Sequence, residues 1–146
     1  MLEIEIRKTP ADDELSGFLV KRPNGHSVIG VNSIQHPNRQ RFTIGHEIGH
    51  FMLHDFEEVH IDKFVVRLRD KTSSTGESDD EVQANRFAAE LLMPQDFLIR
   101  DLPTFASNDL LDERGLARLA KHYLVSTQAM TTRLVSLGLI DGSALP

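Results

Sequence analysis

The sequence contains no cysteine, which excludes a disulfide framework and a thiolate metal site, so histidine and carboxylate side chains would have to bind any metal. It has no apolar run of membrane-spanning length, and its amino terminus, MLEIEIRKTP, lacks the basic and apolar segments of an export signal. Positive charge is scarce, since 16 lysines and arginines face 22 acidic residues, which disfavours a protein built mainly to bind nucleic acid or an anionic membrane. We therefore expect a soluble, cytoplasmic protein.

The first part of the chain carries strand patterns. Residues 2–7 alternate aliphatic and charged side chains, which is the period of a half-buried strand. Further on, the apolar stretches 18–20 and 28–31 flank Asn24-Gly25, a dipeptide typical of tight hairpin turns. We expect an antiparallel pair of strands here.

Most of the remaining chain is helical in pattern. Helical spacing of apolar residues predicts helices over 38–54, 79–93 and 112–140. The valine-rich stretch 64–69 predicts another strand, and the small polar residues 70–80 predict a loop. Together these patterns indicate an α+β fold, in which a small antiparallel sheet packs on a helical core.

The predicted helix 38–54 contains the pattern H-E-x-x-H. His46 and His50 are four residues apart, so both imidazoles lie on one face and can bind one Zn²⁺. Glu47 is rotated by about 100° from His46, which keeps it out of the ligand set but close to the water in the open coordination position. Glu47 is therefore predicted to be the general base that accepts the proton of this water during attack on a scissile carbonyl.

A third ligand has to come from elsewhere, and the candidate is Glu81 at the start of the predicted helix 79–93. Asn85 lies one turn further on, where it could hydrogen-bond a ligating imidazole. The alternative is that Ser78 and Glu81 form a capping box, in which Glu81 only accepts from a backbone N–H. Glu90 lies on another face of this helix and is the poorer candidate.

His54 continues the four-residue spacing of the two ligand candidates. It could hold a ligand in place from outside the ligand set, donate to an oxyanion, or be a core histidine, and the spacing leaves these roles open.

The C-terminal part reads like a helix-turn-helix. Its first helix is predicted to end near Tyr123, and Ser126 to cap the second. DNA binding is one interpretation, but residues 127–138 offer only Arg133 to neutralise phosphate, although Arg114, Arg118 and Lys121 lie just before them. We favour a helical hairpin that packs on the core of the protein.

Two segments together resemble the ImmA/IrrE family of metallopeptidases. These are RFTIGHEIGHFMLH at 41–54 and EVQANRFAAELLMP at 81–94, and the hairpin upstream is similar too, so that the resemblance covers roughly residues 15–140. It implies a gluzincin-like α+β fold, with His46, His50 and Glu81 as metal ligands and Glu47 as the base. It also implies a protein substrate, because family members are associated with limited cleavage of Xre- or Cro/CI-type repressors that control stress-response or mobile-element genes.

We therefore expect a single metallopeptidase domain over 1–146, with its catalytic core at 1–107 and a helical subregion at 108–146. The predicted activity is zinc-dependent endopeptidase cleavage of a helix-turn-helix repressor encoded nearby, with Mn²⁺ as the alternative metal. The competing hypothesis is a DNA- or partner-binding regulator whose peptidase site is vestigial or senses metal.

A small peptidase has to hold an extended substrate backbone across its metal, and a common way is to add the substrate as a strand at a sheet edge. The predicted second hairpin strand, with Val28, Ile29, Gly30, Val31 and Asn32, lies just upstream of the metal helix. Because a strand glycine lets another backbone approach closely, we expect the substrate to bind along these residues.

Overall fold

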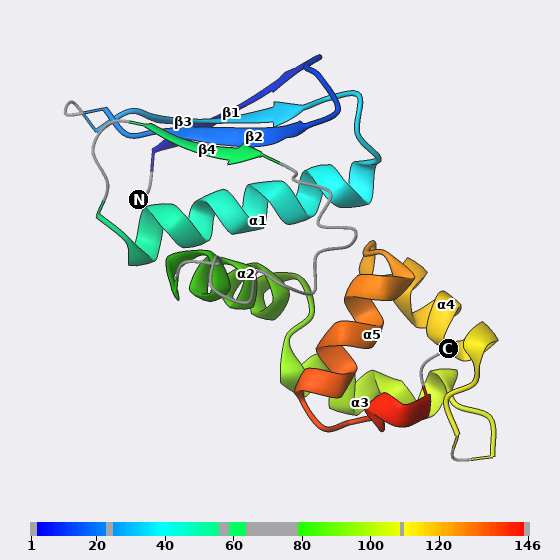
Figure 1. Ribbon diagram of the computed structural model, residues 1–146. Helices are drawn as coiled ribbons and strands as arrows, with labels where there is room; N and C mark the ends of the chain where they lie inside the picture. Colours follow the sequence, from blue (N-terminus) through cyan, green and yellow to red (C-terminus); the bar gives the residue numbers. More distant parts are fainter. Residues whose placement is uncertain (1–2, 23–24, 56–58, 64–78, 109, 145–146) are drawn as a thin grey trace, which may run out of the picture. The chain divides into compact units, whose positions relative to one another are not determined.

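A computed structural model describes residues 3–22, 25–55, 59–63, 79–108 and 110–144 (Figure 1). The chain divides into two compact units. The first, Met1–Ala88, holds the sheet and the predicted metal ligands, and the second, Ala89–Pro146, is built from helices. The boundary lies inside the helix Asp79–Leu92 (α2), well before residue 107, where the sequence suggested the catalytic core to end.

The first unit contains a four-stranded sheet with the strand order β1-β3-β2-β4. Its strands are Ile4–Thr9 (β1), Leu15–Val20 (β2), Ser27–Asn32 (β3) and Val59–Lys63 (β4). The predicted antiparallel pairing of β2 with β3 is confirmed, and β4 also pairs with β2 in antiparallel orientation. The sheet as a whole is mixed, however, because β1 pairs with β3 in parallel. The α+β class is confirmed.

The helix Pro37–Leu53 (α1) covers one face of the sheet (Figure 1). It begins where predicted, with Pro37 at its first position and the His36 ring accepting a hydrogen bond from the Asn38 backbone N–H at 3.1 Å. Alternation along β2 and β3 turns fully or nearly buried aliphatic side chains toward this helix. They pack with its apolar stripe in one cluster of Leu19, Ile29, Val31, Ile4, Ile44, Ile48 and Phe51.

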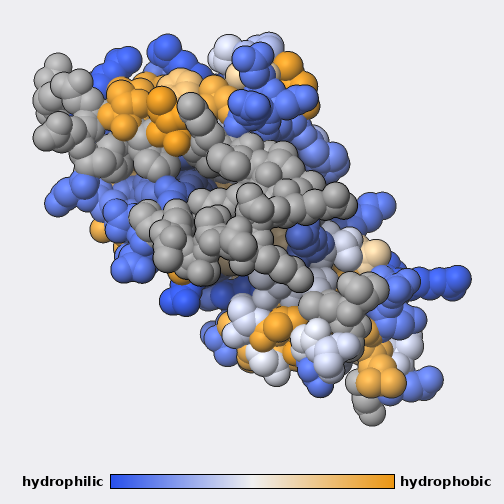
Figure 2. Space-filling model, viewed as in Figure 1, coloured by the Kyte–Doolittle hydropathy of each residue, from blue (hydrophilic) through white to orange (hydrophobic). Residues whose placement is uncertain are grey.

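The opposite face of the sheet is apolar over β2 and β4. In the register of β2 and β4, Phe18 lies opposite Ile61 and Val20 opposite Val59, so these four residues share the face turned away from α1. Val59 and Ile61 are each 54% exposed, and Figure 2 shows apolar residues gathered over the strands.

The second unit packs three helices around one core: Gln95–Phe105 (α3), Glu113–Tyr123 (α4) and Thr127–Ser136 (α5), followed by a short 3-10 turn at Gly142–Ala144 (η1). The predicted end of α4 and the predicted cap of α5 are confirmed, since the Ser126 hydroxyl accepts from the Ala129 backbone N–H at 3.0 Å. The core consists of Met93, Leu98, Leu119, Ala120, Val125, Met130 and Leu134.

The strand predicted at 64–69 lies outside the described residues, as does most of the loop predicted at 70–80. Among the described residues, no helix has the length and apolar character needed to span a membrane.

Candidate metal centre

α1 carries the two histidines of the H-E-x-x-H pattern on its buried side. The helical repeat stacks the His46 and His50 side chains, and their Nε2 atoms are 3.0 Å apart. Both residues are almost completely buried, with 4% and 2% of their surface exposed. The pattern therefore places two imidazole nitrogens at one point inside the first unit.

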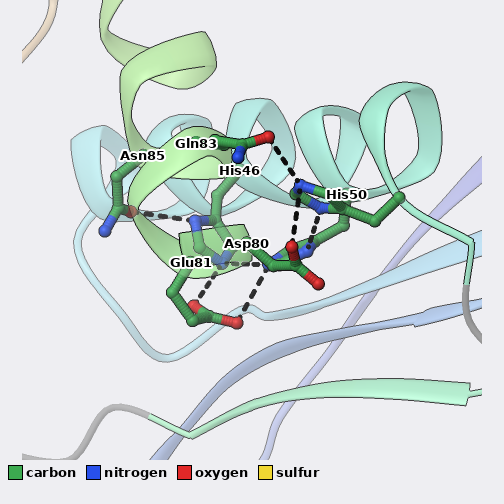
Figure 3. A network of polar contacts seen from close by, with 7 residues as sticks. His46, His50, Asp80, Glu81, Gln83 and Asn85 are labelled. Carbon is green, nitrogen blue, oxygen red and sulfur yellow. Dashed lines mark hydrogen bonds and ion pairs between the residues drawn. The ribbon is translucent and has the colours of Figure 1, made fainter. Parts of the chain in front are cut away.

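α2 brings Glu81 to the same point (Figure 3). Its two carboxylate oxygens lie 3.2 Å from His46 Nε2 and 3.1 Å from His50 Nε2. The carboxylate is thus turned toward the imidazoles, which supports the ligand interpretation over a purely capping one. Ser78, the other half of the suggested capping box, lies outside the described residues.

These three side chains form a group that can hold a metal ion, with one ligand atom from each and all of them within 4.8 Å of one another. Nitrogen and oxygen ligands at about 2.0–2.2 Å from a tetrahedral zinc would be about 3.3 Å apart, close to the separations observed. Two imidazole nitrogens and one carboxylate also match the donors of catalytic zinc sites, which keep a fourth position open for water or substrate. The residues present therefore fit a metalloprotease centre.

A close crossing of α1 and α2 brings Glu81 within reach of the histidines. At Gly49, an added Cβ would lie 3.0 Å from Ala84 Cα and 3.2 Å from both Ala84 O and Phe87 Cβ. Ala84 is fully buried. Small residues on both helices thus allow the two backbones to approach closely, one turn beyond Glu81.

We expect Gly49→Ala to weaken metal binding and to lower the stability of the protein. Inside a helix, alanine is normally about 1 kcal/mol more stabilising than glycine. A loss of stability in this variant would therefore identify the crowding against Ala84 as its cause. Metal titration and thermal unfolding of the metal-free protein measure the two effects. A more stable variant with unchanged metal affinity would show that the helix crossing does not set the position of Glu81.

Each of the two candidate ligand histidines has a hydrogen-bond partner at its other ring nitrogen. Asn85 Oδ1 lies 2.9 Å from His46 Nδ1, as expected from its position one turn after Glu81 (Figure 3). His54, at the C-cap of α1, has its Nδ1 3.0 Å from His50 Nδ1. Both residues are therefore placed to orient a ligand.

Glu47 is fully buried. It follows His46 directly on α1, so the helical rotation of about 100° turns it away from the ligand stripe while keeping it in the same turn. A carboxylate with no solvent exposure, next to His46 in the sequence of the helix, is typical of a functional position.

The prediction that substrate adds along Val28 to Asn32 is wrong in its premise, because β3 is an interior strand. It pairs with β1 on one side and β2 on the other, so it has no free edge. The space over Gly30 is filled as well, since a Cβ there would lie 2.2 Å from the Phe18 ring.

Asn32 has a structural role in place of the predicted one. Its Nδ2 donates to the backbone carbonyls of Ala11, Asp12 and Leu15 at 2.9–3.1 Å, and its Oδ1 accepts from the backbone N–H groups of Ala11 and Ile34. Its side chain, only 2% exposed, therefore fixes the connection between β1 and β2.

Sequence reasoning missed two residues of the site, Gln83 and Asp80, both on α2. Gln83 Oε1 lies 3.3 Å and Asp80 Oδ1 3.6 Å from His54 Nε2 (Figure 3). No local pattern signals either contact, since both join segments far apart in sequence. The close helix crossing at Gly49, by contrast, could have been found from the sequence, because a glycine inside a helical pattern often marks a close packing contact.

The histidine-carboxylate centre on an α+β scaffold defines a metalloprotease type of site, and comparison with known proteins agrees. Residues 2–135 match the family model described as the IrrE N-terminal-like domain. The chain is 35% identical over 104 residues to the radiation response metalloprotease IrrE of Deinococcus radiodurans, an alignment that covers 71% of this chain and 29% of that protein. The chain thus spans less than a third of this relative. The chain belongs to the ImmA/IrrE family of metallopeptidases.

Proposed function

We propose that the chain is a zinc-dependent endopeptidase that cleaves a helix-turn-helix repressor of the Xre or Cro/CI type encoded nearby. The observation that carries the proposal is the meeting of His46, His50 and Glu81 at separations of 3.0–3.2 Å. The donor set favours zinc, since imidazole suits it well, with Mn²⁺ as the alternative. The relative in Deinococcus radiodurans is named a radiation response metalloprotease, which supports a role in stress response here.

In this proposal the three side chains hold the metal, and Asn85 and His54 orient the two rings from outside the ligand set. When bound, the metal would polarise the scissile carbonyl and make the attacking water more acidic. Glu47 accepts the proton of that water and then delivers it to the leaving nitrogen. Burial of Glu47 keeps bulk water away from this proton transfer.

The competing hypothesis of a DNA-binding regulator needs a basic side chain on α5, the second helix of the predicted helix-turn-helix. Arg133, the one basic residue at 127–138, is engaged within the second unit, where it pairs with Glu90 and donates to the Met93 carbonyl at 3.2 Å. Its side chain is only 10% exposed. Phosphate binding would require Arg133 to give up these contacts. The cytoplasmic location stays a prediction.

Glu81→Ala should remove most bound metal and with it the cleavage of the repressor. Removing a residue that only orients a ligand typically lowers metal affinity by about 10–100-fold, and removing a ligand itself should lower it by more. The matched control is Asp79→Ala, which removes an exposed carboxylate from the same helical turn. Elemental analysis and electrophoresis of the incubated repressor measure the two properties.

Full metal occupancy in Glu81→Ala would return Glu81 to a capping role. Wild-type protein that binds metal but leaves the neighbouring repressor intact would contradict the proposed substrate, while the metal centre would stand.

A further inference from the structure

A chain of side chains runs from α2 to the outer ring nitrogen of His50. We propose that Gln83 and His54 form a positioning relay that holds His50 in the one tautomer whose Nε2 can bind metal. The inference rests on the proposed function, because it concerns the affinity of the same metal centre. It adds Gln83, which lies outside the ligand set and outside the H-E-x-x-H helix.

The backbone of His54 is held by hydrogen bonds on both sides. Its backbone N–H donates to the His50 carbonyl at 3.1 Å, and its own carbonyl accepts from Lys21 Nζ at 2.8 Å. With the backbone fixed on both sides and the side chain 8% exposed, the ring has little freedom to turn. The anchoring favours a positioning role over a mobile surface histidine.

The contacts of His54 decide where its proton sits. Its Nε2 faces Gln83 Oε1 at 3.3 Å and, more distantly, Asp80 Oδ1 at 3.6 Å, and both oxygens can only accept. The Nε2 atom therefore carries the proton. In the neutral ring, Nδ1 is then an acceptor.

The tautomer of His54 determines the tautomer of His50. The two Nδ1 atoms are 3.0 Å apart, so one must donate to the other. Because His54 Nδ1 accepts, His50 Nδ1 donates, and the lone pair of His50 Nε2 points to the centre shared with Glu81. The opposite tautomer would put a proton on Nε2, and a metal would first have to displace it.

Helix α2 supplies the acceptor that sets the tautomer of each of the two histidines. Asn85 Oδ1, an acceptor at 2.9 Å, fixes the proton of His46 on Nδ1 directly, whereas Gln83 fixes that of His50 through His54. One helix thus supplies the ligand Glu81 and both acceptors that set the ring tautomers (Figure 3). Metal affinity should depend on Gln83 although Gln83 does not touch a ligand in any contact that the structure describes.

The first test compares His54→Leu with His54→Asn by cobalt(II) titration of the metal-free protein. Leucine removes the acceptor, so affinity should fall by about 10–100-fold. Asparagine carries an amide oxygen as close to Cβ as Nδ1 is in histidine, and should restore affinity to within a few-fold of wild type and recover its cobalt absorption spectrum. Thermal unfolding of the metal-free variants separates loss of affinity from loss of structure.

The second test uses Gln83→Glu and Gln83→Lys. Glutamate keeps an acceptor for His54 Nε2, and we expect affinity at least equal to wild type. Lysine can only donate, which drives His54 to the other tautomer and should weaken cobalt binding by about tenfold. Glu81→Ala, titrated alongside, reports on the metal centre itself.

Equal losses in His54→Leu and His54→Asn, or wild-type affinity in both, would overturn the relay, as would equal effects of the two Gln83 variants. In those cases Glu81→Ala would still lose the metal if the proposed function holds. Tight binding by Glu81→Ala would instead contradict the metal centre, so the two failures are distinguishable.

Discussion

Replacing Glu47 with glutamine should lower the rate of repressor cleavage by about 10²–10⁴-fold while bound metal stays near the wild-type amount. The two side chains have nearly the same size, so the fully buried position can accept the amide. The amide cannot take a proton from the attacking water, and this step is the one assigned to Glu47. Initial cleavage rates and elemental analysis of the same preparation measure both quantities.

Glu14→Gln is the matched control, since it makes the same chemical change at an exposed position of the first unit. It should leave both quantities unchanged. Undiminished cleavage by Glu47→Gln would remove Glu47 from the reaction, and loss of metal would indicate that the residue supports the site structurally.

The sequence was sufficient for the parts of the site that depend on local geometry. His46 and His50 meet because a helix repeats every 3.6 residues, and the same repeat places Asn85 one turn after Glu81. The family resemblance added the pairing of the two segments, which no periodicity could give. The contacts from Glu81 to both imidazoles agree with it.

Prediction failed where a strand acquires a partner from a distant part of the chain. The Asn24-Gly25 turn signals the β2–β3 hairpin, but nothing near β3 signals that β1 pairs with it in parallel from Ile4↔Ser27 to Thr9↔Asn32. Without this pairing β3 would be an edge strand, as a substrate-binding strand requires. The same limit applies to Gln83, whose partner His54 lies 29 positions away.

Asn32 illustrates this limit most clearly, because a polar residue at a strand end can serve substrate or structure. Its five hydrogen bonds all go to backbone groups, two of them N–H donors and three of them carbonyl acceptors. Four of these groups belong to residues 11–15, the connection from β1 to β2. That connection has no regular ladder of its own, so the Asn32 amide takes the place of one.

Asn32→Ala is therefore expected to lower the free energy of unfolding by about 3 kcal/mol. Each buried backbone group that loses its partner costs about 1–3 kcal/mol, and water that reaches some of these groups offsets part of the total cost. Such a loss is a large part of the about 5–15 kcal/mol typical of a domain. The chain has no tryptophan and its one tyrosine lies in the second unit, so urea unfolding is best followed by far-ultraviolet circular dichroism. Asn38→Ala, at a side chain without a hydrogen bond among the described residues, should cost well under about 1 kcal/mol. An Asn32→Ala protein as stable as wild type would show that the connection holds without this amide.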